Sequence, residues 1–180
     1  MEQDLDIRRL FEEVSATACE TLFGRYGVTV RRAEEFEPPA SPELYLCAII
    51  GYTGPRIRGT LVLALTEDVP GLSNPVAAKD RAIERDWVGE LSNQLLGQIK
   101  MELLKRGVEI YMNLPAVLHG QHLAPLPRAQ LKPLKFTMAQ GAAAVWIEIE
   151  TGPGFRLEPA ATMDADADPG PGPGEALLFD

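Results

Sequence analysis

Apolar residues recur with the spacing of an amphipathic helix in two long segments of the chain. Residues 4–23 place them three or four positions apart, which predicts a helix that ends at Gly24. The same spacing over residues 83–105 predicts a second long helix, with Gly107 as its stop. A short helix is also predicted to begin at Val76. The pattern therefore indicates two long helices, each with one apolar face.

Elsewhere the pattern changes to short runs that are rich in β-branched and aromatic residues. Residues 44–54 and 56–66 are two such runs joined by a Gly-Pro turn, which predicts an antiparallel hairpin. A final hairpin is predicted from residues 132–139 and 143–151. Shorter strands or extended segments are expected at residues 28–32 and 108–115, and loops at 34–43 and 67–75. These elements predict an α/β (α+β) fold in which an antiparallel or mixed β-sheet is flanked by long helices.

The length of 180 residues suits one domain with a proper core, and we assign residues 1–151 to it. From Gly152 the sequence is dominated by Pro, Gly, Ala and Asp, a composition that cannot bury enough apolar surface to fold. Residues 152–180 are therefore predicted to be a flexible acidic tail. The segment EALLFD within it is either a short docking peptide or a few stray apolar residues.

Charge and hydropathy narrow the classes of function. The net charge of −9 argues against a protein that binds nucleic acid or an anionic membrane, because both require Lys and Arg to neutralise phosphates. No apolar run approaches the roughly 20 residues that span a bilayer, and the first residues lack the apolar core of a signal peptide. We therefore expect a cytoplasmic protein, in which Cys19 and Cys47 are buried thiols rather than a disulfide.

The helix predicted over residues 83–105 has an unusual polar face. At about 100° per residue, Asp86, Glu90, Asn93 and Gly97 fall within a sector of about 60°. The opposite side carries apolar residues that are expected to face the core: Val88, Leu91, Leu95 and Ile99. The helix is thus predicted to present a carboxylate, an amide and a bare backbone outward.

A solvated polar surface is the simplest explanation for such a face, but two of its residues are unfavourable in a helix. Gly97 is less favourable than Ala by about 1 kcal/mol, and the amide of Asn93 competes for backbone hydrogen bonds. Gly97 either permits a close helix crossing or leaves room for a partner, and its outward position favours the partner. A carboxylate at Glu90 can pair with a cation, and an amide at Asn93 can orient a water molecule.

That pair suits the hydrolysis of a substrate that is already activated, such as an acyl phosphate. No Cys or Ser stands near a plausible His base in the sequence, and no cluster has a convincing spacing for a metal. His119 and His122 lack a third ligand, so they are interpreted as loop histidines. Two small basic clusters are either exposed strand faces or contacts for an acidic partner: Arg31 with Arg32, and Arg56 with Arg58.

The residues of this face also resemble a known signature. Asp86-x3-Glu90-x2-Asn93, followed after residues 94–114 by Pro115, is similar to the motif of the CheC/CheX/FliY family of chemotaxis phosphatases. The surrounding GELSNQLLG, with one glycine before the glutamate and another four residues after the asparagine, resembles the CheX branch. The resemblance adds Gly97 to the motif residues and implies a CheC/CheX-like fold.

The resemblance covers roughly residues 4–151 and implies a protein phosphatase that hydrolyses the phospho-aspartate of a CheY-like response regulator. Glu90 would pair with a lysine of the regulator, and Asn93 would orient the attacking water. No cofactor of its own is implied, because the regulator carries the Mg²⁺. Asp86 and Pro115 would have supporting, structural roles. CheX-like proteins also form homodimers through their sheets.

Two-site members of the family carry a second Glu-x-x-Asn in the first helix. Here Glu12 and Glu13 lack an Asn three residues later, which favours a single-site, CheX-like chain. Two other functions remain open: a non-catalytic module that docks a receiver domain, and a structural adaptor of the flagellar switch. The presence of both Glu90 and Asn93 favours the enzyme, because a pure adaptor has no need of that pair.

Overall fold

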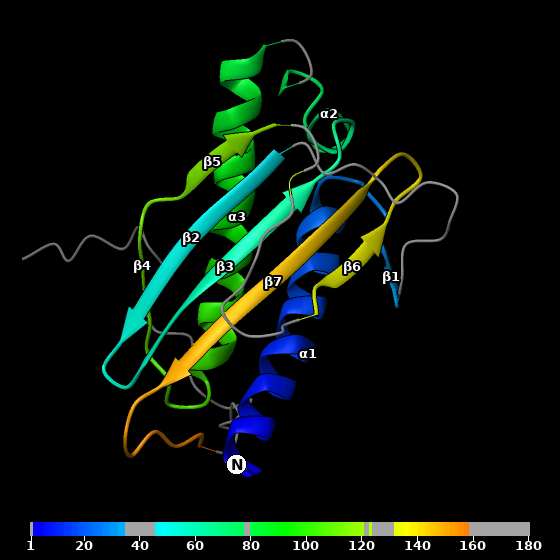
Figure 1. Cartoon of the computed structure of the whole chain (residues 1–180). Helices are drawn as coiled ribbons and strands as arrows, with labels where there is room; N and C mark the ends of the chain where they lie inside the picture. The colour runs from blue at the N-terminus through cyan, green and yellow to red at the C-terminus, as the bar shows by residue number, and fades with distance from the viewer. Residues whose placement is uncertain (1, 35–45, 78–79, 121–122, 124–131, 159–180) are drawn as a thin grey trace, which may run out of the picture.

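Two long helices lie side by side on one face of a β-sheet (Figure 1). They are α1 (Glu2–Arg25) and α3 (Arg81–Leu104), and a short helix, α2 (Val69–Ser73), precedes α3. Both predicted long helices are confirmed to within two residues at each end. The computed structural model describes residues 2–34, 46–77, 80–120, 123 and 132–158. Within these ranges, no helix is both long and apolar enough to cross a membrane.

The described residues form one sheet of seven strands, in which every pair is antiparallel. The strands are β1 (Arg31–Ala33), β2 (Leu46–Gly54), β3 (Ile57–Leu65), β4 (Tyr111–Met112), β5 (Ala116–His119), β6 (Leu134–Thr137) and β7 (Ala142–Thr151). Their order is β1-β6-β7-β3-β2-β4, and β5 also pairs with β2. The β2–β3 and β6–β7 pairs are the two predicted hairpins. The predicted fold class is confirmed, and this sheet is antiparallel rather than mixed.

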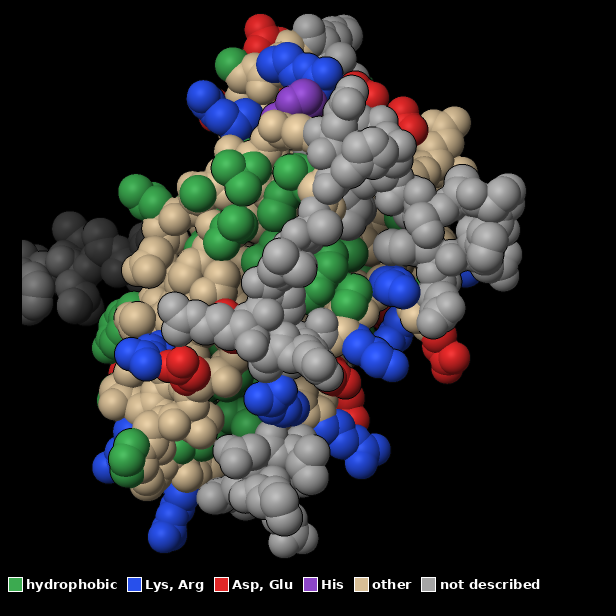
Figure 2. Space-filling model, viewed as in Figure 1, with side chains coloured by type: hydrophobic (Ala, Val, Ile, Leu, Met, Phe, Trp, Pro, Cys, Tyr) green, Lys and Arg blue, Asp and Glu red, His purple; other side chains and the backbone are tan. Residues whose placement is uncertain are grey.

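The sheet face opposite the helices is partly apolar (Figure 2). Hydrophobic side chains gather over the part of this face formed by β5, β2 and β3. Leu118 of β5 is exposed, and Ile49, Val62 and Trp146 are half-buried. The strand register sets Val62 between Ile49 on one side and Trp146 on the other. A contiguous apolar surface of this kind is suited to contact with another protein.

The segment before α3 differs from the prediction. Residues 67–75 are predicted as a loop, but α2 lies within them, so the short helix expected to begin at Val76 is displaced toward the N-terminus. Pro70 stands in the first turn of α2, where its missing N–H breaks no hydrogen bond and its fixed φ suits a helix. After α2 the chain turns, and residues 78–79 lie outside the described part. The predicted loop at residues 34–43 also falls there, apart from its first residue.

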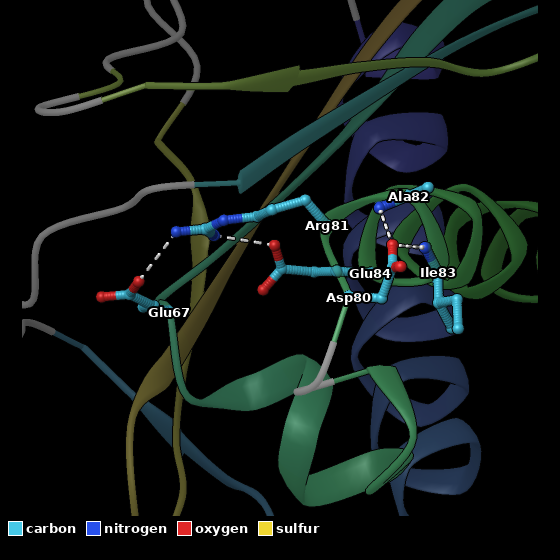
Figure 3. Close-up of polar contacts among 6 residues, drawn as sticks. All are labelled: Glu67, Asp80, Arg81, Ala82, Ile83 and Glu84. Atoms are coloured by element: carbon cyan, nitrogen blue, oxygen red, sulfur yellow. Dashed lines mark hydrogen bonds and ion pairs between the residues drawn. The ribbon is translucent and has the colours of Figure 1, made fainter.

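The rotation of α3 about its axis follows from its apolar stripe. Four apolar side chains of this helix are fully buried, as the helical spacing predicts: Val88, Leu91, Leu95 and Ile99. Burying each such side chain contributes about 1.5–3 kcal/mol, so the opposite face must point away from the core. The helix start is fixed by Asp80, whose carboxylate accepts hydrogen bonds from the backbone N–H of Ala82 (2.6 Å) and Ile83 (3.4 Å) (Figure 3). A cap of this type is worth about 1 kcal/mol.

Both cysteines are buried free thiols, as predicted. Cys19 lies in α1 and Cys47 in β2. Burial raises the pKa of the Cys47 thiol to about 11. Burial, and then the charge of Glu20, raises the pKa of the Cys19 thiol. Neither thiol is therefore a reactive thiolate near neutral pH.

Residues 152–158 lie against the domain, although they belong to the segment predicted as a tail. The backbone N–H of Glu158 donates to the carbonyl of Arg106 (3.1 Å), just after α3. Phe155 packs against the core. Residues 159–180, with the EALLFD segment, lie outside the described part. The boundary between domain and tail therefore stays a prediction.

Candidate functional site

The polar face predicted for α3 points away from the core. Asp86 and Glu90 are exposed, and Asn93 and Gly97 are half-buried. All four lie on the side opposite the buried stripe, because the helix is continuous through them. The structure thus brings Glu90 and Asn93 together one turn apart, as the spacing predicts. Their catalytic roles stay a prediction.

Gly97 leaves an open space on this face. A Cβ added there would meet no heavy atom within 4 Å. A close crossing with another helix, one of the two explanations for this glycine, is therefore wrong. Its cost of about 1 kcal/mol relative to Ala is offset by no internal contact, which leaves clearance for a partner as the explanation.

Pro115 lies against the turn of α3 that precedes Glu90. A Cβ added at Gly89 would lie 3.6 Å from the Cγ of Pro115 and 3.5 Å from the Cγ2 of Val117. Gly89 is itself buried, so β5 and the residue before it pack directly on the helix backbone. Pro115, although far from Gly89 in sequence, thus lies beside the helix that carries the other motif residues. That contact suits the structural role predicted for Pro115.

Asp86 lies one turn before Glu90 and forms an ion pair with its neighbour in the chain. Nη2 of Arg85 is 2.7 Å from Oδ1 of Asp86, and both side chains are mostly exposed. Exposed pairs of this kind contribute little to stability because solvent screens them. The pair gives Asp86 no contact with Glu90, and its supporting role stays a prediction.

The carboxylate of Glu90 is held by a chain of two hydrogen bonds that the sequence analysis missed. Nε2 of Gln94 donates to Oε1 of Glu90 (2.8 Å), and the hydroxyl of Tyr26 donates to Oε1 of Gln94 (2.8 Å). The spacing of four between Glu90 and Gln94 is a local signal that could have revealed the first bond. No local signal exists for Tyr26, which is 68 residues from Gln94 in sequence. Only the packing of α1 against α3 brings it to the site.

Tyr26 is anchored by an aromatic contact. Its ring meets Trp87 edge to face, with the ring centroids 4.9 Å apart and the planes at 82°. Nε1 of Trp87 donates in turn to Oγ of Ser73, the last residue of α2 (2.9 Å). Side chains from α2 and α3 thus hold the residue that follows α1 beside the candidate site.

A second polar cluster stands at the start of α3 (Figure 3). It lies beside a cavity of about 580 Å³. Nη1 of Arg81 is 2.8 Å from Oε2 of Glu84, and Nη2 is 3.3 Å from Oε1 of Glu67. Hydrogen bonds and charge, from Glu84 first and then Glu67, raise the pKa of the Arg81 guanidinium. Because the buried carboxylate of Glu84 already has its cation, this cluster is a structural tie between α3 and the segment that joins β3 to α2.

The predicted loop histidines and basic clusters are placed as follows. His119 is not in a loop, because it is the last residue of β5, which pairs with β2. His122 lies outside the described residues. No group of three or more His, Cys, Asp or Glu in the described ranges is placed to hold a metal ion. All four arginines of the basic clusters are exposed, and Arg58 pairs with Glu150.

Comparison with known families agrees with the resemblance noted in the sequence. A family model described as Chemotaxis phosphatase CheX matches residues 46–139, more than half of the chain, and this range includes Glu90, Asn93 and Pro115. A search of curated proteins finds no match.

Solved structures show the same fold. The chemotaxis protein CheX from Vibrio vulnificus has a TM-score of 0.66 and 19% identity, over 78% of this chain and 96% of that chain. A CheC-like superfamily protein from Shewanella sp. PV-4 has a TM-score of 0.64 and 19% identity, over 78% and 97% of the two chains. The CheX–CheY–BeF3–Mg²⁺ complex from Borrelia burgdorferi matches with a TM-score of 0.55 and 14% identity, over 78% and 95%.

Proposed function

This chain belongs to the CheX family of chemotaxis phosphatases, and from that premise we propose that it hydrolyses the phospho-aspartate of a CheY-like response regulator. The observation that carries the proposal is the pair of Glu90 and Asn93 on the outward face of α3. The open space at Gly97, one turn further along, leaves room for the regulator to approach. The reaction makes the protein an aspartyl-phosphate phosphatase.

Asn93 is the residue that positions the water. An amide both donates and accepts hydrogen bonds, so it can hold a water molecule in line with the bond to be broken. The water oxygen attacks phosphorus, and the bond between phosphorus and the aspartyl oxygen breaks. The products are a free aspartate carboxylate and inorganic phosphate, and the water proton passes to the phosphate or to solvent. Holding the reactants in this geometry removes much of the entropic cost of the reaction.

Glu90 pairs with a lysine ammonium of the regulator. This ion pair sets how deeply Asn93 enters the active site of the regulator. The Mg²⁺ belongs to the regulator and neutralises charge on the phosphoryl oxygens, so the phosphatase brings no cofactor of its own. The CheX–CheY–BeF3–Mg²⁺ complex from Borrelia burgdorferi, which has the same fold, supports this choice of partner.

Three further motif residues support the site without touching the reacting atoms. Pro115 fixes the chain before β5 against the turn that carries Glu90. Gly97 provides clearance for the regulator, and Asp86 contributes charge at the rim of the docking face.

A second copy of the chain is the proposed partner of the outer sheet face. The apolar surface around Leu118, Val62 and Trp146 suits the sheet-to-sheet homodimer that the resemblance implies. The protein would act in the cytoplasm on a protein substrate, with neither nucleic acid nor a membrane as partner.

The test follows the decay of a phosphorylated CheY-like receiver domain, alone and with the full-length protein. We expect the wild type to accelerate loss of phosphate, and Asn93→Ala and Glu90→Ala to reduce that acceleration by about a hundredfold. Asn93→Ala should still bind the receiver, because it removes the group that holds water and leaves the cation pair in place.

A matched control is available on the neighbouring helix. Glu13 of α1 is an exposed glutamate that pairs with Arg9, one turn earlier in the same helix, so Glu13→Ala should leave the rate unchanged. If the wild type binds receivers but does not accelerate the loss of phosphate, the proposed enzyme is wrong. The rival function, a non-catalytic module that docks a receiver or the flagellar switch, would then take its place.

A further inference from the structure

We propose that Tyr26 and Gln94 are positioning residues that hold the carboxylate of Glu90 ready for the cation of the regulator. The inference rests on the proposed function, because it assigns two more residues to the same site. Two hydrogen bonds of 2.8 Å connect the three side chains, from the Tyr26 hydroxyl to Gln94 and from Gln94 to Glu90. A carboxylate on an exposed helix surface is thereby tied to the residue that follows another helix.

The chemistry of the three groups fixes the direction of this chain. An ionised carboxylate only accepts hydrogen bonds, so Gln94 must turn its NH2 group toward Glu90. Its carbonyl oxygen then faces Tyr26, which must donate. Turning the amide by half a rotation would set its oxygen against those of Glu90. The Tyr26 hydroxyl therefore favours the one orientation of Gln94 that serves the site.

The far end of the chain is held rigidly. The backbone N–H of Tyr26 donates to the carbonyl of Phe23 (3.0 Å), which fixes the turn after α1. The ring of Tyr26 is set against Trp87, and Trp87 is held by Ser73 of α2. The hydroxyl that starts the chain thus has a position set by packing rather than by solvent.

The consequence for Glu90 is preorganisation. One carboxylate oxygen, Oε1, is occupied by Gln94, which leaves Oε2 for the incoming ammonium. A side chain that is already held loses less conformational freedom when a partner binds, and its geometry is set before the encounter. A Glu90–Gln94 pair that served only the stability of α3 would need no contribution from Tyr26.

The experiment is a double-mutant cycle in the full-length protein with a phosphorylated CheY-like receiver. Tyr26→Phe removes only the hydroxyl and keeps the ring on Trp87, and Gln94→Leu removes both hydrogen bonds. We expect each variant to lower kcat/KM about three- to tenfold, the usual effect of one hydrogen bond. In the Gln94→Leu background, Tyr26→Phe should have no further effect, because it acts only through Gln94.

A second readout does not depend on catalysis. In the wild type, the side-chain NH2 protons of Gln94 should exchange slowly with water by NMR and resonate apart from those of a free amide. Tyr26→Phe and Glu90→Ala should each move them toward the free position. Tyr111→Phe removes an exposed hydroxyl on β4 and is the matched control, with no change expected in either readout.

The outcomes separate the two proposals. A wild type without phosphatase activity overturns the proposed function, and the role of Tyr26 and Gln94 in it. An active wild type in which Tyr26→Phe has the same effect in both backgrounds overturns this inference alone. Wild-type Gln94 NH2 resonances at the position of a free amide would overturn it as well.

Discussion

The two long helices share one structural plan and differ on their outward faces. Each carries an exposed glutamate, Glu13 on α1 and Glu90 on α3, followed two residues later by a fully buried serine. Three residues after the glutamate, α1 has a buried Ala16 where α3 has a half-buried Asn93. Both helices bury the opposite side in the same core. Their difference therefore lies in a few side chains rather than in how the helices form or pack.

The same comparison explains the glycine. Seven residues after the glutamate, α1 has an exposed Glu20, an ordinary residue for a solvated helix, and α3 has Gly97 with open space around it. An amide and a glycine together weaken α3 slightly, and α1 has neither at the corresponding positions, Ala16 and Glu20. The two helices thus pack alike but differ in their exposed side chains, and the proposed chemistry depends on those exposed side chains.

The largest expected effect tests whether the helices are structurally equal. Leu22 of α1 and Leu95 of α3 are both fully buried, so Leu22→Ala and Leu95→Ala should each lower the free energy of unfolding by about 2–5 kcal/mol. Urea denaturation followed by circular dichroism measures the loss. Glu20→Ala, on the exposed side of α1, is the control and should change the free energy by less than about 0.5 kcal/mol. A large loss from one helix alone would break the comparison.

A smaller effect is expected when the amide is moved to the other helix. Ala16 is buried, so Ala16→Asn should lower the free energy of unfolding by about 1–3 kcal/mol, because its amide loses water without gaining partners. Asn93→Ala should instead raise it by a few tenths of a kcal/mol, since Ala is the better helix former. Urea denaturation measures both. A stable Ala16→Asn variant with a second phosphatase activity would contradict the view that α1 is structural only.

Gly97 provides the third test. Gly97→Ala should raise the free energy of unfolding by up to about 1 kcal/mol, because a Cβ there meets nothing. Gly97→Leu should also fold, yet weaken binding to the receiver by filling the clearance. Gly24 in the last turn of α1 is equally open, so Gly24→Leu is the control for added bulk and should leave binding unchanged. Receiver titrations followed by fluorescence separate the two variants; equal affinities would remove the role given to Gly97.

The last test concerns pH. The pKa of Cys47 is raised to about 11 and that of Cys19 is also raised, both first by burial, whereas an unfolded thiol titrates near about 8.5. The unfolded state therefore loses these protons first as pH rises. The contribution of the two protonated thiols to the free energy of unfolding is fully present below about pH 8.5. It should fall as the pH rises from there to 11. Urea midpoints across that range measure the slope, and Cys47→Ala should make it shallower; an unchanged slope would show that other groups cause it.

Much of the fold could be predicted because periodicity reports burial. The stripe of Val88, Leu91, Leu95 and Ile99 determines how α3 rotates, and the β-rich runs on either side of Pro55 determine the first hairpin. Helix α2 was missed because five residues are too few for a periodic signal and Pro70 indicates a turn as readily as a first helical turn. The strand at His119 was missed because its pairing partner, β2, is distant in sequence.

The candidate site was predictable only where it is local. Glu90, Asn93 and Gly97 belong to one helix, so a fixed angular step places them together. Tyr26 comes from the turn after α1 and reaches Gln94 only once the two helices pack. Likewise, the approach of Pro115 to Gly89 depends on where β5 joins the sheet, which no spacing in the sequence reveals.

The outward position of Glu90 and Asn93 has a consequence for where the proposed reaction can occur. A helix surface is convex, so it encloses nothing and excludes no water by itself. The walls of the reaction chamber must come from the regulator, and the chamber exists only while the two proteins are in contact. Each protein then supplies half of a catalyst. Dissociation alone would switch such an enzyme off, without any lid, inhibitor or change of fold.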